Sequence, residues 1–493
     1  MLEGLEAVEI RFSTLDSIID YRIEPEFFEK RFLSLESYFG KTVYKSFFEI
    51  ANYENGRAFS SESFNDENYG IRISKIGDVR NERAIETWDC VDFEEFSTQK
   101  GNYLANDDIL MSLTGDPPDI GKVNLIFEPK EKATWNQRVA RIFLRENQES
   151  FINPKVFYIV LKSKYCREQL ERYAKGIRQR NLGIDCIELL KVPIFSENFQ
   201  LEIYKKIQNS FNFLTESQSL YRQAEELLLE ELGLKDWQPT NKNTAEKTFA
   251  NSFLESGRLD AEYYQPKYDE LEEKIRSNNV GRVQNPADVE PTNVEPTYIK
   301  KIAEIEVFNA RGLQPIYVEG GTLDIINSKH ILESTLDYEN FEKTDASFWE
   351  SQARGRVYRN DILTYTTGAN IGRTQVYLSD KQALASNHVN ILRINEGNPI
   401  YVAFVINSFV GRLQTEKLSA GSAQQELYPK DLTQFYIPFI AVEHQNKIEE
   451  LIIESENLKT LSKQLLAIAK RGVEIAIEQD EAAALAWIDL EKK

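Results

Sequence analysis

Two carboxylates flank a pair of prolines at residues 116–119, and such a string could carry chemistry on a nucleic-acid base. A loop of this kind that acts on a flipped-out base needs an aromatic residue in its fourth position, where the ring stacks on the base. The fourth residue here is Asp119, and the sequence holds no Phe-x-Gly-x-Gly cofactor loop. We therefore interpret the string as a proline turn between two strands.

The same segment also fits the motif of a magnesium-dependent nuclease core. Asp119 and Glu128 would then hold the metal, with Lys130 as the accompanying base. Pro129 would disrupt a central strand beside the second carboxylate. A second copy of the segment has Asn370 opposite Asp119. A nuclease or methyltransferase acting alone therefore stays as the alternative function.

The sequence holds few residues from which another catalytic site could be built. No Ser/His/Asp set, Cys/His set or P-loop can be assembled. Three scattered cysteines fit reduced thiols, and neither a disulfide framework nor a zinc site. We expect a non-catalytic chain with no metal and no cofactor of its own. The histidines and cysteines are His330, His388, His444, Cys90, Cys166 and Cys186.

Residues that suit DNA contact recur at matching places in both halves of the chain. Bidentate base contacts need Arg, Lys, Asn or Gln, while Ser, Thr, Gly and backbone amides serve phosphates. Each residue alone is also explained by a turn or a strand cap, so the recurrence of whole sets favours DNA contact. The candidates are Thr114, Gly115, Lys122, Gln137, Arg138, Arg178, Gln179 and Arg180, then Thr367, Gly368, Asn370, Arg373, Asn387, His388, Gln424 and Gln425.

Short strands must position these residues. Gly, Asn, Asp and Pro punctuate β-like runs, as strand-and-turn chemistry requires. One helix is expected after the strands of each half, at residues 155–173 and 400–418. The expected strands are residues 71–76, 108–113, 122–127 and 138–144, then 315–319, 359–367, 374–378 and 388–394.

An internal duplication organises the chain. Residues 176–224 and 421–469, compared without a gap, are identical at 13 of 49 positions. Chance identity of roughly 6% would give about three. Upstream, Asp-Ile-Leu is followed by Thr-Gly and then by Ile-Gly and a base at residues 108–122, and again at 361–373. A repeat of about 245 residues indicates two related domains rather than a solenoid.

Each copy closes with a long helical pattern, expected at residues 197–235 and 441–490, in which apolar residues recur at three- and four-residue steps. A helix of ~33 residues is about 50 Å long, more than a small domain covers. We therefore expect the two helices to pair with each other and to carry contacts with partner proteins. The candidate docking residues are Ile203, Ile207, Leu220, Ala224, Ile448, Ile452, Leu465 and Ala469.

Charge is distributed unevenly along the chain. The formal net charge is −20, which argues against coating nucleic acid by bulk charge. Residues 138–191 nevertheless carry 12 Lys and Arg against 6 Asp and Glu, and both helical segments are acidic. Positive globular parts joined to negative helices suit a protein whose globular parts, here called the heads, contact an anion. No signal peptide or membrane span is evident, so we expect a cytoplasmic protein.

These elements together, occurring twice, resemble the DNA-specificity subunit of type I restriction–modification systems. Residues 258–268, Arg-Leu-Asp-Ala-Glu-Tyr-Tyr-Gln-Pro-Lys-Tyr, are a typical opening of one copy. The likeness spans essentially the whole chain. The elements stand at residues 108–122, 136–139, 176–182, 192–194 and 200, and again at 361–373, 387–389, 421–427, 437–439 and 443–445.

The resemblance implies an α+β fold, with two globular target recognition domains separated by two long antiparallel helices in pseudo-two-fold symmetry. It implies recognition of a bipartite double-stranded DNA site. Two adenine methyltransferase subunits and the restriction subunits would dock as partners and would bind S-adenosylmethionine, ATP and Mg²⁺. The expected segments are residues 1–196 and 257–440 for the recognition domains, 197–235 and 441–490 for the helices, and 236–256 for a linker. A coiled-coil adaptor without a DNA role is a further alternative.

Overall fold

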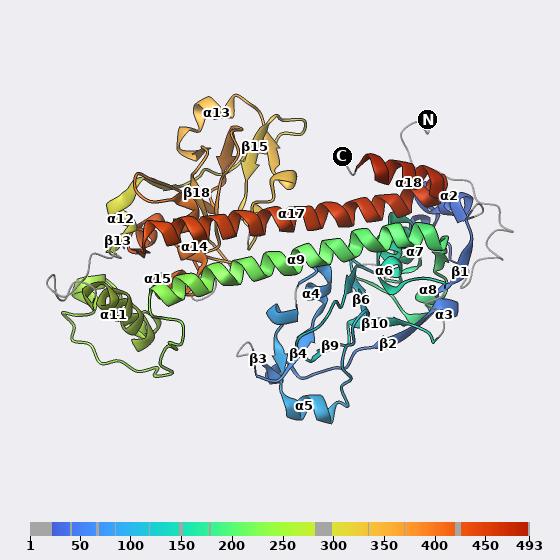
Figure 1. Cartoon of the computed structure of the whole chain (residues 1–493), viewed down its shortest axis with the longest axis horizontal. Coiled ribbons are helices and arrows are strands. Elements are labelled where there is room, and N and C mark those ends of the chain that lie inside the picture. Colours follow the sequence, from blue (N-terminus) through green and yellow to red (C-terminus); the bar gives the residue numbers. More distant parts are fainter. Residues whose placement is uncertain are drawn as a thin grey trace. The chain divides into compact units, whose positions relative to one another are not determined.

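The computed structural model describes residues 22–39, 42–65, 69–83, 85–117, 119–146, 151–176, 179–281, 298–333, 335–368, 370–419 and 425–491. The chain divides into two units (Figure 1). Unit 1 comprises residues 1–214 and 460–493, and unit 2 comprises residues 215–459. Each long helix contributes one part of its length to each unit, so the units do not follow the segment boundaries expected from the sequence.

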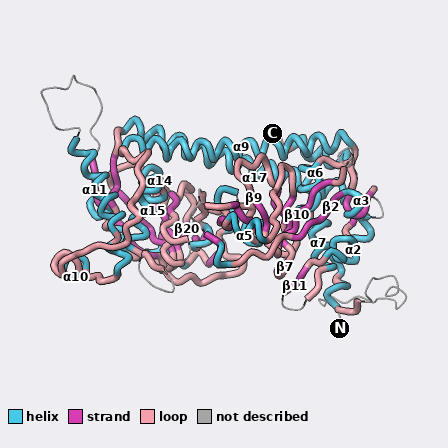
Figure 2. The backbone as a smooth tube through the Cα atoms, turned by 90° about the horizontal axis from the view of Figure 1, so that it is seen from below, coloured by secondary structure: helices cyan, strands magenta, loops and turns pink. Residues whose placement is uncertain are grey.

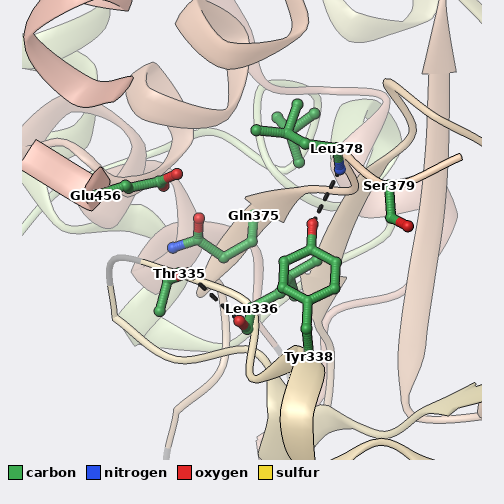
Figure 3. A pocket seen from close by; sticks show the side chains of 8 residues that line it. Thr335, Leu336, Tyr338, Gln375, Leu378, Ser379 and Glu456 are labelled. Atoms are coloured by element: carbon green, nitrogen blue, oxygen red, sulfur yellow. Dashed lines mark hydrogen bonds between the residues drawn. The ribbon is translucent and has the colours of Figure 1, made fainter. Parts of the chain in front are cut away.

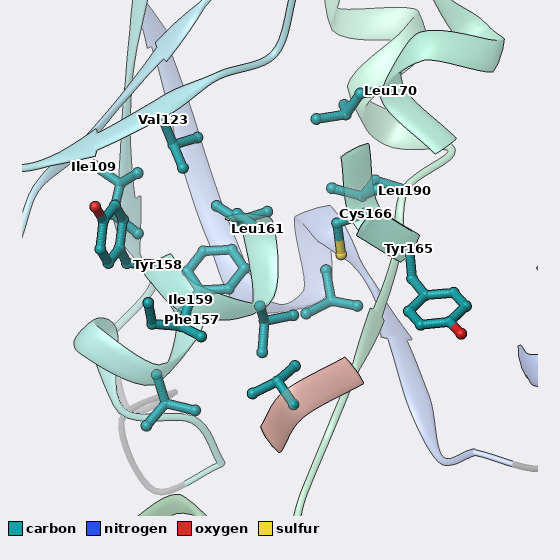
Figure 4. Close-up of a cluster of buried hydrophobic side chains, with 14 of the residues drawn as sticks. Ile109, Val123, Phe157, Tyr158, Ile159, Leu161, Tyr165, Cys166, Leu170 and Leu190 are labelled. Atoms are coloured by element: carbon teal, nitrogen blue, oxygen red, sulfur yellow. The ribbon is translucent and has the colours of Figure 1, made fainter. Parts of the chain in front are cut away.

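An antiparallel sheet forms the centre of unit 1. Its strands lie in the order β2 (Ala51–Asn55), β10 (Val139–Leu144), β6 (Ile109–Ser112), β8 (Val123–Leu125). Because side chains alternate along a strand, Ile109 and Met111 enter the core under the helices, while Leu110 enters a second core on the other face. Figure 4 shows Phe157 and Tyr158 of the following helix within the first of these cores.

Unit 2 repeats this sheet with β14 (Glu306–Arg311), β21 (Val389–Ile394), β18 (Ile362–Tyr365) and β19 (Thr374–Val376). Ile362 and Leu363 again point into different cores. A second sheet accompanies the first in each unit and contains one parallel pair, β4 with β9 and β15 with β20. The second sheets run β3 (Phe64–Asn65), β5 (Cys90–Val91), β4 (Ile71–Ser74), β9 (Ala133–Trp135), and β16 (Glu342–Thr344), β15 (Leu323–Ile326), β20 (Ala383–Ala385), β17 (Arg356–Val357).

Seven of the eight expected strand runs contain a strand, and the run at residues 315–319 does not. That prediction is wrong. Pro315 has no N–H to donate to a ladder, and Ile316 and Tyr317 are exposed rather than packed against a sheet. The apolar residues that suggested a strand belong to a surface loop.

Each helix expected after the strands is two helices. In unit 1 these are α6 (Pro154–Lys162) and α7 (Lys164–Tyr173), and in unit 2 α14 (Pro399–Asn407) and α15 (Phe409–Leu418). The break falls at Ser163 and at Ser408, both of which have extended backbone angles. Ser163 caps α7, because its hydroxyl accepts a hydrogen bond from the Cys166 N–H.

Helices α9 (Glu197–Glu231) and α17 (Val442–Glu478) pair antiparallel within each unit. In unit 1, Ser210 Oγ donates to the Ser462 carbonyl at 2.8 Å. In unit 2, Ser455 Oγ donates to the Ser217 carbonyl, also at 2.8 Å. Ser210 and Ser455 are matching positions of the duplication, so the two units repeat one buried contact.

The second long helix ends earlier than expected. α17 stops at Glu478, and a separate helix, α18 (Glu481–Leu490), follows instead of one helix over 441–490. Asp480 caps α18 by accepting from the Ala483 N–H at 2.8 Å. Ala484 and Ile488 of α18 are buried in the unit 1 core.

Shorter elements complete both units. In unit 1 they are η2 (Pro25–Phe28), α2 (Lys30–Phe39), β1 (Tyr44–Ser46), α3 (Phe47–Ile50), η3 (Ser61–Ser63), α4 (Ile76–Arg80), η4 (Ile85–Thr87), α5 (Phe93–Thr98), β7 (Thr114–Gly115), β11 (Arg180–Asn181), α8 (Ile184–Glu188) and β12 (Lys191–Pro193). In unit 2 they are α10 (Phe253–Ser256), η5 (Ala261–Tyr264), α11 (Pro266–Gly281), β13 (Tyr298–Lys301), α12 (Ile302–Ile305), η6 (Ser328–His330), η7 (Tyr338–Asn340), α13 (Phe348–Ser351), η8 (Ala353–Gly355), α16 (Pro429–Leu432) and β22 (Tyr436–Phe439). In the described part of the chain, no helix has the length and apolar character needed to cross a membrane.

Candidate DNA interface

Three of the segments predicted to contact DNA meet in unit 1. The Leu113 N–H donates to the Arg138 carbonyl at 3.0 Å, and the Leu182 N–H donates to the Leu113 carbonyl at 2.8 Å. Just beyond Leu113, β7 pairs antiparallel with β11 (Figure 2). We call residues 113–115, 136–138 and 179–182 the first loop cluster.

Unit 2 brings the matching segments together in the same way. The Thr366 N–H donates to the His388 carbonyl at 3.1 Å, and the Leu427 N–H donates to the Thr366 carbonyl at 2.9 Å. The Gly368 N–H donates to the Gln425 carbonyl at 3.0 Å. Residues 366–368, 386–388 and 425–427 form the second loop cluster. The recurrence seen in the sequence thus corresponds to one repeated arrangement of three loops.

A buried ion pair anchors the strand that leads into each cluster. In unit 1, Arg141 on β10 donates to Asp108 at 2.6 Å. Burial raises the pKa of Asp108, and the Arg141 guanidinium opposes that rise. In unit 2, Arg393 makes two hydrogen bonds of 2.7 Å to Asp361. The aspartate of the repeated Asp-Ile-Leu sequence is therefore structural.

The glycine of the repeated Ile-Gly step is also structural. Gly121 and Gly372 have φ of 67° and 86°, in the left-handed region that glycine adopts without strain. A Cβ on Gly372 would lie 2.7 Å from the side chain of Thr415, and one on Gly121 would lie 2.9 Å from Leu170. The turn must pack this closely because it lies against α7 or α15.

The candidate side chains differ in how far they reach the surface. Five are exposed and lie in the two clusters, and six more are half-buried. Arg178 and Gln424 lie outside the described residues. The exposed side chains are Gln137, Arg138, Gln179, His388 and Gln425. The half-buried ones are Thr114, Lys122, Arg180, Asn370, Arg373 and Asn387.

Two of the candidates do not present a side chain for DNA contact. Thr367 is only 7% exposed, so its side chain offers little surface, and the predicted DNA contact at this position remains a prediction. Gly115 is buried, and a Cβ there would lie 2.2 Å from Arg80 Nη2, so this glycine makes room for an arginine rather than for DNA.

Several of the half-buried basic groups already have partners within the chain. Lys122 Nζ lies 2.8 Å from Asp119, and this ion pair lowers the pKa of the Asp119 carboxyl. Arg180 Nη1 donates to the Glu171 carbonyl at 3.2 Å. These groups can approach a phosphate only if they exchange or share these partners, whereas Arg138 is exposed and has no such partner among the described residues.

Sequence reasoning missed four arginines beside the clusters. Arg57 is exposed, and its carbonyl accepts from the Gln137 N–H at 2.9 Å. Arg80 donates to the Thr114 carbonyl at 2.6 Å. Arg311 donates to the Thr366 carbonyl at 3.3 Å, and Arg354 donates to the Gly312 carbonyl at 3.3 Å. Gly56 and Gly312, which precede or follow an arginine in the sequence, were the signal that could have found two of them. A Cβ on Gly56 would overlap the backbone at residues 135–136, and a Cβ on Gly312 would overlap the backbone at residues 385–386, so each glycine lets its segment pack against a loop cluster.

Asp119 and Glu128, the two carboxylates of the nuclease motif, do not lie together. Asp119 precedes β8 and Glu128 follows it, at φ 41°, so they lie at opposite ends of the strand. The three residues of β8 alone span roughly 10 Å of extended chain, which separates the two carboxylates along the strand. Within the described ranges, no group of three or more His, Cys, Asp or Glu side chains could hold a metal ion.

The residues predicted to dock partners are largely occupied within the chain. Ile203, Ile207 and Ala469 are buried in the unit 1 core, and Ala224 and Ile448 in the unit 2 core. Ile452, at 8% exposed, is also buried in the unit 2 core, and Leu220 and Leu465 are half-buried. The apolar stripe that holds the buried residues packs inside the chain, and partner docking at these positions remains a prediction. The exposed apolar residues of the helices are Leu201, Val442, Ile453 and Leu461.

A family model and a curated relative both match this chain. Residues 42–225 match the family model described as the type I restriction modification DNA specificity domain. The type I restriction enzyme EcoBI specificity subunit of Escherichia coli is 22% identical over 448 residues, covering 86% of this chain and 84% of that protein. Among solved structures, a type I restriction–modification S subunit from M. genitalium has 13% identity and a TM-score of 0.42, over 89% of this chain and 96% of that one. The HsdS subunit from Thermoanaerobacter tengcongensis has 12% identity and a TM-score of 0.29, over 89% and 97%.

Each unit thus presents one loop cluster beside an antiparallel sheet. The matched family model spans the first cluster up to residue 225, and the likeness to the E. coli relative extends over both copies. Residues 42–225 therefore carry a DNA specificity domain of the type I restriction–modification kind, and the chain is similar to a specificity subunit over 86% of its length.

Proposed function

We propose that each loop cluster reads one half of a bipartite double-stranded DNA site. The observation that carries this proposal is the repetition of the same three-loop arrangement around Leu113 and around Thr366. One chain with two similar but not identical readers suits an asymmetric target. The two clusters differ in their exposed side chains, so they would recognise different bases.

The exposed polar side chains divide into base readers and phosphate contacts. Gln137 and Gln179 in the first cluster and Gln425 in the second carry the donor and acceptor pair that reads adenine in the major groove. Arg138 has the donor fork that reads guanine. Lys122 and Arg373 follow the tight Ile-Gly turns and are better placed as phosphate contacts.

The helices would carry the protein partners. Two methyltransferase subunits, which would bind S-adenosylmethionine, would dock on the outward faces of α9 and α17, where Leu201, Ile453 and Leu461 are exposed. Restriction subunits using ATP and Mg²⁺ would join that assembly. The duplication explains how one chain offers similar surfaces to two copies of one partner. The helix pair would also fix the gap between the half-sites.

Binding to scrambled half-sites tests the two-reader proposal. The chain assembled with its methyltransferase subunits is titrated with duplexes in which one half of the target, defined by methylome sequencing, is scrambled. Gln425→Ala should weaken recognition of one half-site only, by ~1–3 kcal/mol per lost base contact. Arg373→Ala should weaken binding to all sequences and reduce the salt slope by about one unit. Equal loss of preference at both half-sites in Gln425→Ala would contradict separate readers.

A further inference from the structure

A cavity of about 270 Å³ lies in unit 2, away from the second loop cluster, between the loop after η6, strand β19 and helix α17 (Figure 3). Sites for small molecules and cofactors usually occupy roughly 300–1,000 Å³. This cavity lies just below that range, so it suits a single side chain or a small molecule of similar size. Its lining residues are Thr335, Leu336, Tyr338, Gln375, Val376, Leu378, Ser379 and Glu456.

Two hydrogen bonds fix how the Gln375 amide lies in the cavity. Gln375 Nε2 donates to the carbonyls of Leu332 and Glu333, at 3.2 and 3.1 Å. Those two bonds use both amide hydrogens, so the amide oxygen is what Gln375 offers to the cavity. Figure 3 shows the Glu456 carboxylate on the same side as this amide, and the Tyr338 ring across from it.

The duplication explains why a cavity exists here. In unit 1, Phe211 stacks on Phe127 with ring centroids 4.7 Å apart, and Tyr158 lies beside it at 6.4 Å. The matching residues of unit 2 are Glu456, Leu378 and Ala403. Three aromatic rings are thus replaced by smaller side chains, one of which is a carboxylate. The space that unit 1 fills with rings is a cavity in unit 2, and the Glu456 carboxylate is part of its lining.

The surroundings of the cavity favour a positive occupant. Burial raises the pKa of Glu456 to about 7, although Lys459 opposes the rise. Burial also raises the pKa of Tyr221 on α9, with Glu225, Glu333 and Glu456 contributing, while Arg412 opposes it. A half-buried carboxylate on a cavity wall can accept further hydrogen bonds from a cation, and the charge pair offsets part of the cost of desolvation.

We propose that this cavity is a binding site for a cationic group, a guanidinium or an alkylammonium. The Glu456 carboxylate and the Gln375 amide oxygen would accept its hydrogen bonds, and the Tyr338 ring would cover it. The cation could come from a basic side chain of a protein docked beside α17 or from a free small molecule. Only the first source rests on the proposed function, so the site itself can be tested separately.

Titration of the full-length chain with agmatine, a guanidinium probe, tests the site directly. Isothermal titration or saturation-transfer NMR should detect saturable binding of agmatine and none of N-butylurea, a neutral analogue of its guanidinium end. Glu456→Gln should weaken agmatine binding at least tenfold. Glu456→Phe, which installs the residue of the matching position in unit 1, should abolish binding while thermal unfolding confirms the fold. Glu454→Gln, on an exposed position of the same helix, is the matched control.

The source of the cation is decided by a second measurement. If agmatine competes with methyltransferase assembly and Glu456→Gln weakens assembly tenfold, a partner side chain occupies the site. If agmatine binds and assembly is unaffected, the site serves a free cation. Equal agmatine binding by the wild-type chain and Glu456→Gln, or equal binding of butylurea, would overturn the proposal. DNA binding by the same variants reports independently on the two-reader function.

Discussion

The contribution of an acidic residue to the stability of this chain depends on its burial and on its hydrogen-bond partners. Asp361 is 1% exposed and receives two hydrogen bonds from Arg393 and one from the Tyr358 N–H. Asp380 is 85% exposed and forms a surface pair with Arg359 at 3.3 Å. Two aspartates in one recognition unit therefore have very different roles in stability.

Asp361→Asn should destabilise the protein by roughly 2–4 kcal/mol. Loss of one member of a buried ion pair costs about 3–5 kcal/mol, and the one-third exposure of Arg393 lowers that figure. Chemical denaturation followed by tryptophan fluorescence measures the change. The matched variant Asp380→Asn should change stability by about 1 kcal/mol or less. Similar losses in both would show that the buried pair has no special role.

Glu456 should make stability depend on pH in the opposite sense to a salt-bridged carboxylate. Its pKa is raised from 4.5 to about 7 in the folded chain. Between these values the folded state holds a proton that the unfolded state has released, so stability falls as pH rises from about 4.5 to 7 and then levels off. Glu456→Gln should flatten that part of the profile. Thermal unfolding across pH 4–8 measures it, and an unchanged profile would contradict a protonated Glu456.

At the scale of elements, one carboxylate joins two helices of unit 1. Glu478 at the end of α17 accepts from Lys164 and Tyr165 of α7, at 2.9 and 2.8 Å, and from Arg471 at 3.0 Å. Although burial opposes it, these donors together hold the pKa of Glu478 at about 2. The contact ties the last turn of α17 to the head of unit 1.

Glu478→Gln should therefore destabilise unit 1 at neutral pH and lose its effect in acid. The depressed pKa contributes stability above the ordinary value of 4.5, and this contribution is lost as pH falls toward 2. The difference in unfolding free energy between wild type and variant should shrink over that window. Hydrogen exchange at α7 locates the loosening. A difference that stayed constant from pH 7 to pH 3 would exclude the charge as its cause.

The sequence predicted the helices and strands more completely than the contacts that these elements make with one another. The repeated Asp-Ile-Leu and Ile-Gly steps located the central strands, because strand periodicity and glycine turns are local properties. The breaks at Ser163 and Ser408 were missed, since a serine inside an apolar run is compatible with either a continuous helix or a cap. The stripe containing Ile203 and Ile448 indicated a buried face, but periodicity cannot tell whether a partner or the chain itself covers it. Likewise, the exposure of Gln179 and the burial of Thr367 depend on how distant loops pair.

At the scale of the whole molecule, the helices should set the distance between half-sites. Four residues inserted after Thr215 and four after Thr460 would lengthen both helices by about 6 Å. The insertions lie between the serine contacts, so the pairs Ser210–Ser462 and Ser217–Ser455 are kept. The extended chain should select a DNA gap longer by one or two base pairs. Methylome sequencing measures the gap between the half-sites. An unchanged gap would show that the helices do not set this distance.

Unit 1 is built from the first and the last part of the chain, and this has a consequence for its synthesis on the ribosome. Its core contains Phe157 and Ile203 from the first part of the chain, but also Ala469, Val473 and Ile488 from the last part. At roughly 5–20 residues per second, the 245 residues between positions 214 and 460 take on the order of ten seconds to a minute to translate. The first unit to emerge is thus the last to be completed, and its apolar surface must wait for α17 and α18. A chain stopped after Lys459 should keep protease resistance in unit 2 and lose it in unit 1, which limited proteolysis with mass spectrometry can resolve.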